Sequence, residues 1–376
     1  MAKNPLTHDQ IKTQIKPRVA VKSAIEQTIY FDLLVPMTEA ADFTVEKAVM
    51  PEARILKNKR MFPLRPRVPA RGFGVKLAFK ASDLGTRVFR PSLRGTSLKL
   101  APPSGAEFKG FLPDHLAMTP IPAPLEKELY VKRYLDPLAP KLEAGVHQGT
   151  TVFPPDERYT FSDTSYPWST IGRVDTAGGI ASGVLVGPRH LLTCSHVIVW
   201  NADNTCGWVQ FRPSFFDNNA PFGEAWATHW YAYKKVYGPD IDVDEGRQDY
   251  VVLVLDRRIG EWCGHMGSIP YSDDWDGKPY WSHVGFPGDL AACQRPSYQG
   301  SISLDGAFWE GASHQRIWHR GDVWKGQSGG PFFAWWAGES FPRVVSVQSG
   351  QNADENSSSG GGRMVDLIIR ALNDFP

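Results

Sequence analysis

Ser328 lies in a glycine-rich turn whose composition suits a nucleophile. The turn is Gly326-Gln327-Ser328-Gly329-Gly330-Pro331. Gly326 has no Cβ, so its backbone N–H can point into the same concave nest as the N–H of Ser328. Two such donors aimed at one point form an oxyanion hole, which stabilises the charge that develops on a carbonyl oxygen. A surface turn without a catalytic role can have the same composition. The residues that could pair with Ser328 must therefore decide whether the turn is catalytic.

A serine hydroxyl is a weak nucleophile unless a neighbouring base takes its proton. All ten histidines precede Ser328, which excludes the order Ser, Asp, His that the α/β-hydrolases use. The order His, Asp, Ser is met by His196, which follows an apolar run, and by Asp249, which precedes the β-branched run Val251–Leu255. Alone, these residues would be a core histidine and a strand-capping acid; together with the serine turn they predict a catalytic triad.

The three motifs resemble those of the chymotrypsin-like serine peptidases. In that family the histidine closes a Thr-Ala-Ala-His-like stretch, here Thr193-Cys194-Ser195-His196. The serine lies in Gly-Asp-Ser-Gly-Gly-Pro, from which this chain departs only at Gln327. The resemblance implies a serine endopeptidase in which His196 is the general base and Asp249 orients it. The N–H groups of Gly326 and Ser328 then bind the oxyanion, and water resolves the acyl-enzyme.

The resemblance is strongest to the bacterial glutamyl endopeptidase-like branch, and it covers about residues 150–376. Asp156-Glu157-Arg158, followed by Thr164–Trp168, is similar to the beginning of that domain. Val284–Asp289 is similar to its Gly-Tyr-Pro-Gly-Asp turn. The resemblance implies an all-β fold of two six-stranded β-barrels of the chymotrypsin type with a C-terminal helix. It also implies a mature start close to Val152.

The residue pattern after position 150 agrees with an all-β fold. Short apolar runs are separated by turns rich in Gly, Pro and Asp, which is typical of a barrel or sandwich. Near the end of the chain the apolar residues change to a helical period. Four of them share one face: Val365, Ile368, Ile369 and Leu372. We expect a C-terminal helix here, and the resemblance implies that it docks on the second barrel.

The chain divides into two parts of opposite charge. Residues 1–145 hold 24 Lys and Arg, 14 Asp and Glu, and 16 of the 30 prolines; the remainder holds 17 basic and 26 acidic residues. We expect a basic, proline-rich, partly ordered pro-segment or accessory domain at 1–145 and a peptidase domain at 146–376. The opposite charges slightly favour docking of the first part on the second over a solvated or nucleic-acid-facing surface. Removal of a pro-segment would cut between about Leu142 and Phe153.

Within the first part, strands are expected at 28–31 and 74–79, and a short helix at 127–143. The residues after Met1 lack the apolar region of a secretory signal. No apolar run approaches the roughly 18 residues of a membrane helix. No membrane span is therefore expected. The compartment is left open: the family resemblance suggests a secreted protein, and the sequence alone allows a cytoplasmic one.

Four cysteines would allow two disulfides. They are Cys194, Cys206, Cys263 and Cys293. The pairing to test first is Cys263 with Cys293. Cys194 lies two residues before His196, where a buried free thiol is at least as well favoured as a disulfide.

No metal or cofactor is expected. The cysteines and histidines lack the spacing of a zinc site. Asp240, Asp242, Asp244 and Glu245 resemble half of a calcium-binding loop, but Val251 stands where such a loop needs a bidentate glutamate. A solvated acidic loop is the favoured interpretation.

Two features bear on the substrate residue before the cleaved bond, P1. Asp322 lies six residues before Ser328, where trypsin-like enzymes keep an aspartate that selects Arg or Lys; capping of a turn is the alternative. Gln348 stands, with Ser349 and Gly350, on the expected substrate-binding strand, where glutamyl endopeptidases have a histidine. A neutral amide does not offset a carboxylate's charge. The sequence therefore favours Arg or Lys at P1, then small or apolar residues, over Glu.

Two other functions remain open from the same residues. A catalytically silent binding module would have a broken triad, whereas all three triad residues are present here. An esterase would use the same site on simple esters, and a comparison of peptide and ester hydrolysis separates the two. The expected partner is a protein or peptide substrate.

Overall fold

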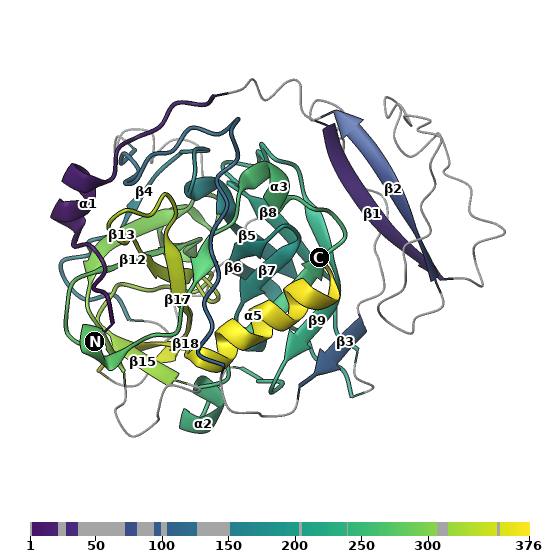
Figure 1. Cartoon of the computed structure of the whole chain (residues 1–376). Coiled ribbons are helices and arrows are strands. Elements are labelled where there is room, and N and C mark those ends of the chain that lie inside the picture. Colours follow the sequence, from purple (N-terminus) through teal and green to yellow (C-terminus); the bar gives the residue numbers. More distant parts are fainter. Residues whose placement is uncertain are drawn as a thin grey trace.

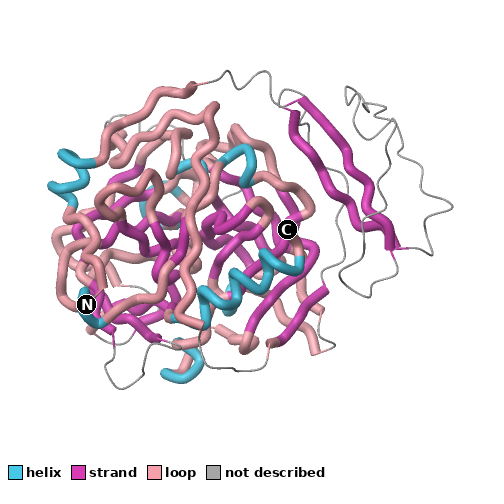
Figure 2. Tube along the Cα trace, in the orientation of Figure 1, coloured by secondary structure: helices cyan, strands magenta, loops and turns pink. Residues whose placement is uncertain are grey.

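The protein is described as a computed structural model of residues 2–21, 28–36, 72–80, 94–98, 104–125, 151–202, 205–238, 240–306, 315–351 and 354–376. The expected helix at 127–143 and positions 142–150 of the expected cleavage region lie outside these residues. Strands and loops dominate the described residues, and most helices among them are short (Figure 2). This agrees with the all-β class expected from the sequence.

The first sheet closes into a barrel of six antiparallel strands (Figure 1). Its strands are β5 (Ile171–Thr176), β6 (Gly179–Gly187), β7 (His190–Thr193), β8 (Val209–Pro213), β9 (Ala225–Ala232) and β10 (Val251–Leu255). Their order is β10-β7-β6-β5-β8-β9, and a further pairing of β10 with β9 closes the ring. β3 (Arg94–Ser97) pairs in parallel with the outer edge of β9. All five residues of β10 are buried, as expected for an apolar β-branched run.

The second sheet forms a half-barrel. Its strands are β4 (Tyr159–Thr160), β11 (Gly267–Ser268), β12 (Trp281–Gly285), β13 (Ser297–Ile302), β14 (Leu304–Gly306), β15 (Gln315–His319), β16 (Pro331–Ala334), β17 (Arg343–Gln351) and β18 (Asn356–Gly360). Their order is β14-β15-β18-β17-β16-β12-β13-β4, with β11 on β17. Only Ser303 separates β13 from β14, so one stretch of chain pairs with both β12 and β15. The two-barrel fold is confirmed, but strand pairing closes only the first barrel.

The two sheets share a hydrophobic cluster. Val184 and Leu192 of the first sheet pack in it with Phe333 and Val347 of the second, and all four are fully buried. Each such side chain contributes about 1.5–3 kcal/mol when it leaves water. The shared cluster fixes how the ends of β7 and β10 face the loops of the half-barrel.

Short helical turns lie between the strands. They are α2 (Val243–Gly246), α3 (Gly260–Cys263), α4 (Gly288–Ala291), η6 (Trp168–Thr170), η7 (Ser195–Val197) and η8 (Asp273–Trp275). The acids of the half calcium loop serve α2: the Asp242 side chain caps its first turn, accepting from Glu245 N–H at 2.7 Å. Asp244 pairs with Arg247 at 3.4 Å and Glu245 with Lys234 at 3.5 Å.

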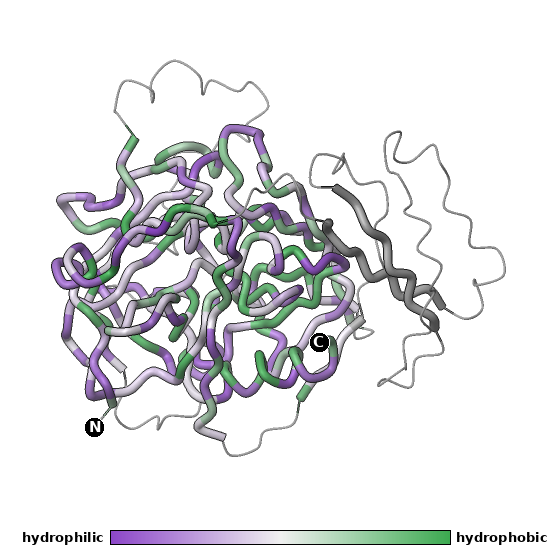
Figure 3. Tube along the Cα trace, turned by 45° about the horizontal axis from the view of Figure 1, so that its top comes forward, coloured by the Kyte–Doolittle hydropathy of each residue, from purple (hydrophilic) through white to green (hydrophobic). Residues whose placement is uncertain are grey.

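The C-terminal helix α5 (Gly362–Asp374) is amphipathic, and it carries both hydrophobic and hydrophilic residues in Figure 3. Val365 and Ile368 are fully buried as expected, whereas Ile369 and Leu372 are only partly buried. The expected docking on the second barrel is wrong, because α5 packs on β7, β9 and β10 of the first. Met364, Leu367 and Ala371 complete its buried face, and the C=O of Ala371 lies 3.1 Å from His190 Nε2.

Two N-terminal segments pack on the barrels. α1 (His8–Gln14) begins with a capping box at Thr7. Ile11 and Met118 are buried in the same hydrophobic cluster as Trp335. Met118 also pairs with Arg18 through two backbone hydrogen bonds, of 2.9 and 2.7 Å.

The expected strands at 28–31 and 74–79 fall within β1 (Thr28–Pro36) and β2 (Gly72–Lys80), which pair with each other. None of the helices described here is long and apolar enough to cross a membrane.

Candidate active site

Strand pairing brings His196 and Asp249 to the same end of the first barrel. β7 and β10 are antiparallel neighbours, with Thr193 opposite Val251. His196 lies three residues after Thr193, in the helical turn η7, and Asp249 lies two residues before Val251. Ser328 comes from the half-barrel, in the turn between β15 and β16. The site is therefore assembled between the two sheets.

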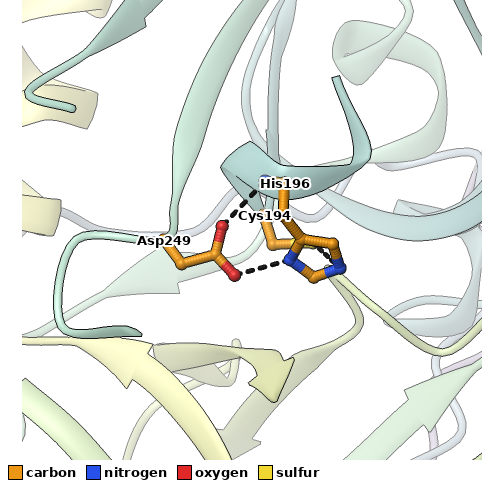
Figure 4. A group of neighbouring side chains, drawn as sticks. All are labelled: Cys194, His196 and Asp249. Atoms are coloured by element: carbon orange, nitrogen blue, oxygen red, sulfur yellow. Dashed lines mark hydrogen bonds and ion pairs between the residues drawn. The ribbon is translucent and has the colours of Figure 1, made fainter. Parts of the chain in front are cut away.

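The three side chains form one hydrogen-bonded line. His196 Nδ1 lies 2.6 Å from Asp249 Oδ2, and His196 Nε2 lies 3.2 Å from Ser328 Oγ. Figure 4 shows the carboxylate facing the Nδ1 edge of the ring, with Cys194 behind it. The second oxygen of Asp249 accepts the backbone N–H of His196 at 2.8 Å, which fixes the ring relative to the acid. The histidine ring can thus receive a proton from the serine on one side while the acid binds the other.

Asp249 is buried, yet its contacts favour the charged form. Burial would raise its pKa, but the charge of His196 and hydrogen bonds from His196 and Ser349 lower it below 3.8. Ser349 Oγ donates to Asp249 Oδ2 at 2.6 Å. The pKa of His196 responds in the opposite sense: burial lowers it, but the charge of Asp249, with nearby Cys194, raises it well above 6.5.

The turn around Ser328 requires its glycines. Gly326 and Gly329 have φ angles of +99° and +81°, which other residues rarely adopt. A Cβ on Gly326 would lie 2.2 Å from Phe286 O, and one on Gly329 would lie 2.0 Å from Thr193 Oγ1. Among the described residues, no hydrogen bond takes up the backbone N–H of Gly326 or Ser328. Both donors therefore remain available to an oxyanion.

Ser182 of β6 supports this turn, a role that the sequence analysis missed. Its Oγ donates to Gly326 O at 2.7 Å and accepts from Phe286 N–H at 2.9 Å. Its backbone N–H donates to Ser328 O at 2.8 Å. The first barrel thus holds the turn of the half-barrel. A serine within an apolar strand was the available signal, and by itself it does not indicate a role.

Asp322 is engaged by the backbone of residues 153–157. Its two oxygens accept N–H groups of Phe153 at 2.7 Å and Glu157 at 2.9 Å, and Gln299 Nε2 donates to it at 3.1 Å. Burial raises its pKa above 3.8 despite these hydrogen bonds. Only 1% of Asp322 is exposed. Of the two roles expected for Asp322, these contacts support capping rather than binding a basic P1 side chain.

Gln348 is oriented by a buried histidine that the sequence analysis did not single out. His319 Nε2 lies 3.0 Å from Gln348 Oε1, and Gln348 Nε2 donates to Gly350 O at 3.2 Å. Burial, with the charge of His283, lowers the pKa of His319 to about 3. A neutral histidine therefore backs a neutral amide on the expected substrate-binding strand. Ser349, the next residue, points instead to Asp249.

All four cysteines are free, so the expected disulfide between Cys263 and Cys293 is wrong. Cys263 is buried in the same hydrophobic cluster as Ile11 and Trp335. Cys293 lies beside the serine turn, where a Cβ on Gly326 would come within 2.8 Å of its Sγ. Cys194 is a buried free thiol, which confirms that alternative.

One group of residues in the described part of the chain could hold a metal ion. The ligand atoms of Cys194, His196 and Asp249 lie within 4.8 Å of one another. Burial raises the pKa of the Cys194 thiol, and metals bind the thiolate. The histidine and the acid are also bonded to each other. A bound ion would have to break that bond.

Comparison with known proteins gives one curated relative and several similar structures. No family model matches the chain. The chain is 22% identical over 179 residues to the glutamyl endopeptidase of Bacillus licheniformis. The match covers 47% of this chain and 52% of that protein, so the chain spans about half the length of its curated relative.

Several of the solved structures that resemble this chain are named as proteases. A Glu endopeptidase in complex with MPD matches with a TM-score of 0.48 and 19% identity, over 59% of this chain and 99% of that one. The protease Anisep from Arthrobacter nicotinovorans gives a TM-score of 0.40 and 19% identity, covering 54% and 92% of the two chains. The described architecture, a closed barrel and a half-barrel with a C-terminal helix, is that of the chymotrypsin-like serine peptidases.

Proposed function

We propose that the chain is a serine endopeptidase that hydrolyses peptide bonds through His196, Asp249 and Ser328. The observation that carries the proposal is the continuous line from Asp249 Oδ2 to His196 Nδ1, at 2.6 Å, and from His196 Nε2 to Ser328 Oγ, at 3.2 Å. Each distance is within reach of a hydrogen bond, as general-base catalysis requires. The order of the three residues along the chain is that of the two-barrel peptidases.

The reaction follows from these positions. Ser328 Oγ attacks the substrate carbonyl carbon while His196 Nε2 takes the hydroxyl proton. Asp249 stabilises the imidazolium that forms and keeps Nδ1 protonated. His196 then gives the proton to the leaving amine, which leaves an acyl group on Ser328. Water, deprotonated by His196, attacks this ester and releases the second product.

Negative charge develops on the substrate oxygen in both tetrahedral states. The free N–H groups of Gly326 and Ser328 are the donors that would bind it. Removal of one such donor typically lowers kcat by about 10²–10³-fold. Two donors beside Ser328 that are unpaired within the described part of the chain support the peptidase over a silent binding module, as does the presence of all three triad residues.

For specificity, we propose a neutral P1 side chain. Asp322 already binds backbone N–H groups, and Gln348 with His319 offers no net charge. The curated relative is named for glutamyl substrates, but the cation that a glutamate side chain would need is not supplied by Gln348. Mass spectrometry of products from a denatured protein mixture tests both parts: cleavage supports the peptidase, and the residues before the cuts identify P1.

We also propose that the N-terminal part docks on the peptidase domain in solution. The buried positions of Leu6, Ile11 and Met118 support this. Further support comes from the hydrogen bond of Leu6 N–H to Trp335 O, at 2.7 Å. A cut upstream of Thr151 would then leave this part bound.

A further inference from the structure

Residues 151–158, here called the junction segment, run along the turn that carries Ser328. The side chain of Asn356 binds both the N–H of Thr151, at 3.2 Å, and its C=O, at 2.8 Å. Val323 N–H also donates to Thr151 O at 3.1 Å. Together with the two backbone bonds of Asp322 described above, these contacts attach the segment to the residues just before Ser328.

Arg158 ends the junction segment and is a buried cation. Its side chain has no exposed surface and forms ion pairs with Asp156, at 2.9 Å, and with Asp289, at 2.6 Å. Asp289 lies in the first turn of α4, on the other side of the guanidinium. Burial alone would lower the pKa of Arg158, but hydrogen bonds and charges from the two carboxylates raise it. The guanidinium is therefore charged and held in one orientation.

The remaining contact of this guanidinium reaches the residue before the nucleophile. Arg158 Nη1 donates to Gln327 Oε1 at 2.8 Å. The same oxygen accepts the backbone N–H of Trp324 at 2.8 Å, and only 1% of Gln327 is exposed. Gln327 borders the peptide plane that carries the Ser328 N–H. Its backbone N–H donates to Trp324 O at 3.0 Å and its side chain accepts from Trp324 N–H, so Gln327 also closes the turn that holds the Gly326 N–H.

We propose that Arg158 is a positioning residue for the oxyanion hole: it holds Gln327, and Gln327 holds the N–H groups of Gly326 and Ser328. The inference rests on the proposed peptidase function. Arg158 is an internal residue, so no newly formed amino terminus is needed to hold the turn. The uncut chain is therefore catalytically competent, and any removal of the N-terminal part serves another purpose than activation.

The first test compares Arg158→Met with a matched control, Arg343→Met. Arg343 is also a buried arginine between two carboxylates, Glu107 and Glu339, at 2.7 and 2.8 Å. Both variants should lose stability. Only Arg158→Met should lower kcat on a peptide substrate, by about 10²-fold, as expected for a disturbed oxyanion donor. KM should stay within about threefold, since the substrate-binding strand is untouched.

A second set of variants keeps the test decisive if Arg158→Met does not fold. Gln327→Met leaves both ion pairs of Arg158 intact and removes the acceptor of both Arg158 Nη1 and the Trp324 N–H, so it should lower kcat at least as much. The double variant should be no worse than Gln327→Met alone, because Arg158 acts on the turn through Gln327. Arg158→Lys should restore part of kcat, since an ammonium can still donate one hydrogen bond to Gln327.

The reaction of each full-length protein with a fluorophosphonate distinguishes the possible failures. If the wild type does not react, the proposed function fails. If the wild type reacts and Arg158→Met reacts as fast as Arg343→Met, only the role of Arg158 is overturned. The intact mass of the labelled wild type tests the second part: label on the uncut chain supports competence without cleavage, and label confined to a shortened chain refutes it.

Discussion

Ser349 of the half-barrel donates a 2.6 Å hydrogen bond to Asp249 Oδ2, the same oxygen that faces His196 Nδ1. The bond joins β17 of one sheet to the end of β10 in the other, across the interface where the site lies. It stabilises the charged carboxylate and also aligns the sheet that carries Ser328 with the one that carries His196. Docking of the sheets and electrostatics of the site are thus coupled through one oxygen atom.

Ser349→Ala should therefore weaken both properties. A hydrogen bond to a charged group contributes about 1.5–3 kcal/mol, so urea denaturation at neutral pH should show a loss of this order. We expect kcat/KM to fall roughly tenfold, because Asp249 then holds the imidazole less firmly. Ser346→Ala is a suitable control, since Ser346 is a buried serine of the same strand that bonds Ser358 instead. A drop in kcat/KM as large in the control would contradict the assignment.

The pH dependence of activity should reflect the raised pKa of His196. The catalytic base must be neutral, so kcat/KM should rise with pH along a limb centred above pH 6.5, the ordinary value for histidine. In Asp249→Asn the attracting charge is absent and burial lowers the pKa. The limb should then move to lower pH, while kcat falls by about 10⁴-fold. A limb at the same pH in both proteins would show that another group titrates.

The same pair predicts how stability changes with pH. The pKa of His196 is higher in the folded protein than in the unfolded chain. Its contribution to the free energy of unfolding is therefore fully present below pH 6.5, and it is lost as pH rises through the folded-state pKa. The lowered pKa of Asp249 has the opposite sign: its contribution is present above pH 3.8 and lost as pH falls. Urea midpoints across pH should show both trends in the wild type, and both should be weaker in the double variant Asp249→Asn/His196→Gln.

Asp322 should affect stability more than specificity. Asp322→Ser removes the acceptor of two backbone N–H groups and of Gln299, so the melting temperature should fall clearly. The ratio of kcat/KM for Arg and Ala at P1 should stay the same, since the carboxylate does not serve the substrate. A large fall in kcat/KM for the Arg substrate alone would instead show that Asp322 binds a basic P1 side chain, as in trypsin-like enzymes.

Much of the site could be predicted from the sequence because its chemistry is local. The glycine turn, the histidine after β7 and the acid before β10 each stand at an element boundary that the apolar pattern marks, and the structure brings all three together. Contacts between distant segments were not accessible in this way. Nothing in the pattern indicated that Asp322 would meet residues 153–157, or that Arg158 would meet Gln327.

The C-terminal helix shows the same difference between local and long-range features. Its helical period is present in the sequence. The sheet on which it packs depends on where the preceding strand ends, and the spacing of apolar residues does not give that position. The prediction of a disulfide is wrong for a related reason. An even number of cysteines permits a bond, but it does not show that Cys263 lies close to Cys293.

Cys194 offers a test of which side chain is the nucleophile. Its Sγ lies 3.8 Å from His196 Nε2, so a thiol and a hydroxyl both stand beside the same base. Burial raises the pKa of the thiol, which disfavours the reactive thiolate. Cys194→Ala should therefore keep kcat within a few-fold of the wild type. Loss of activity in this variant together with resistance to serine-directed reagents would point to the sulfur.

The most direct test of the triad is the site of fluorophosphonate labelling, mapped by peptide mass spectrometry on the full-length protein. The proposed mechanism predicts one adduct, on Ser328 Oγ. The adduct should be absent from Ser328→Ala, strongly slowed in His196→Gln and retained in Cys194→Ala. Ser328→Ala should also lower peptide turnover by several orders of magnitude. An adduct on another residue, with Ser328 unmodified in an active protein, would contradict the mechanism.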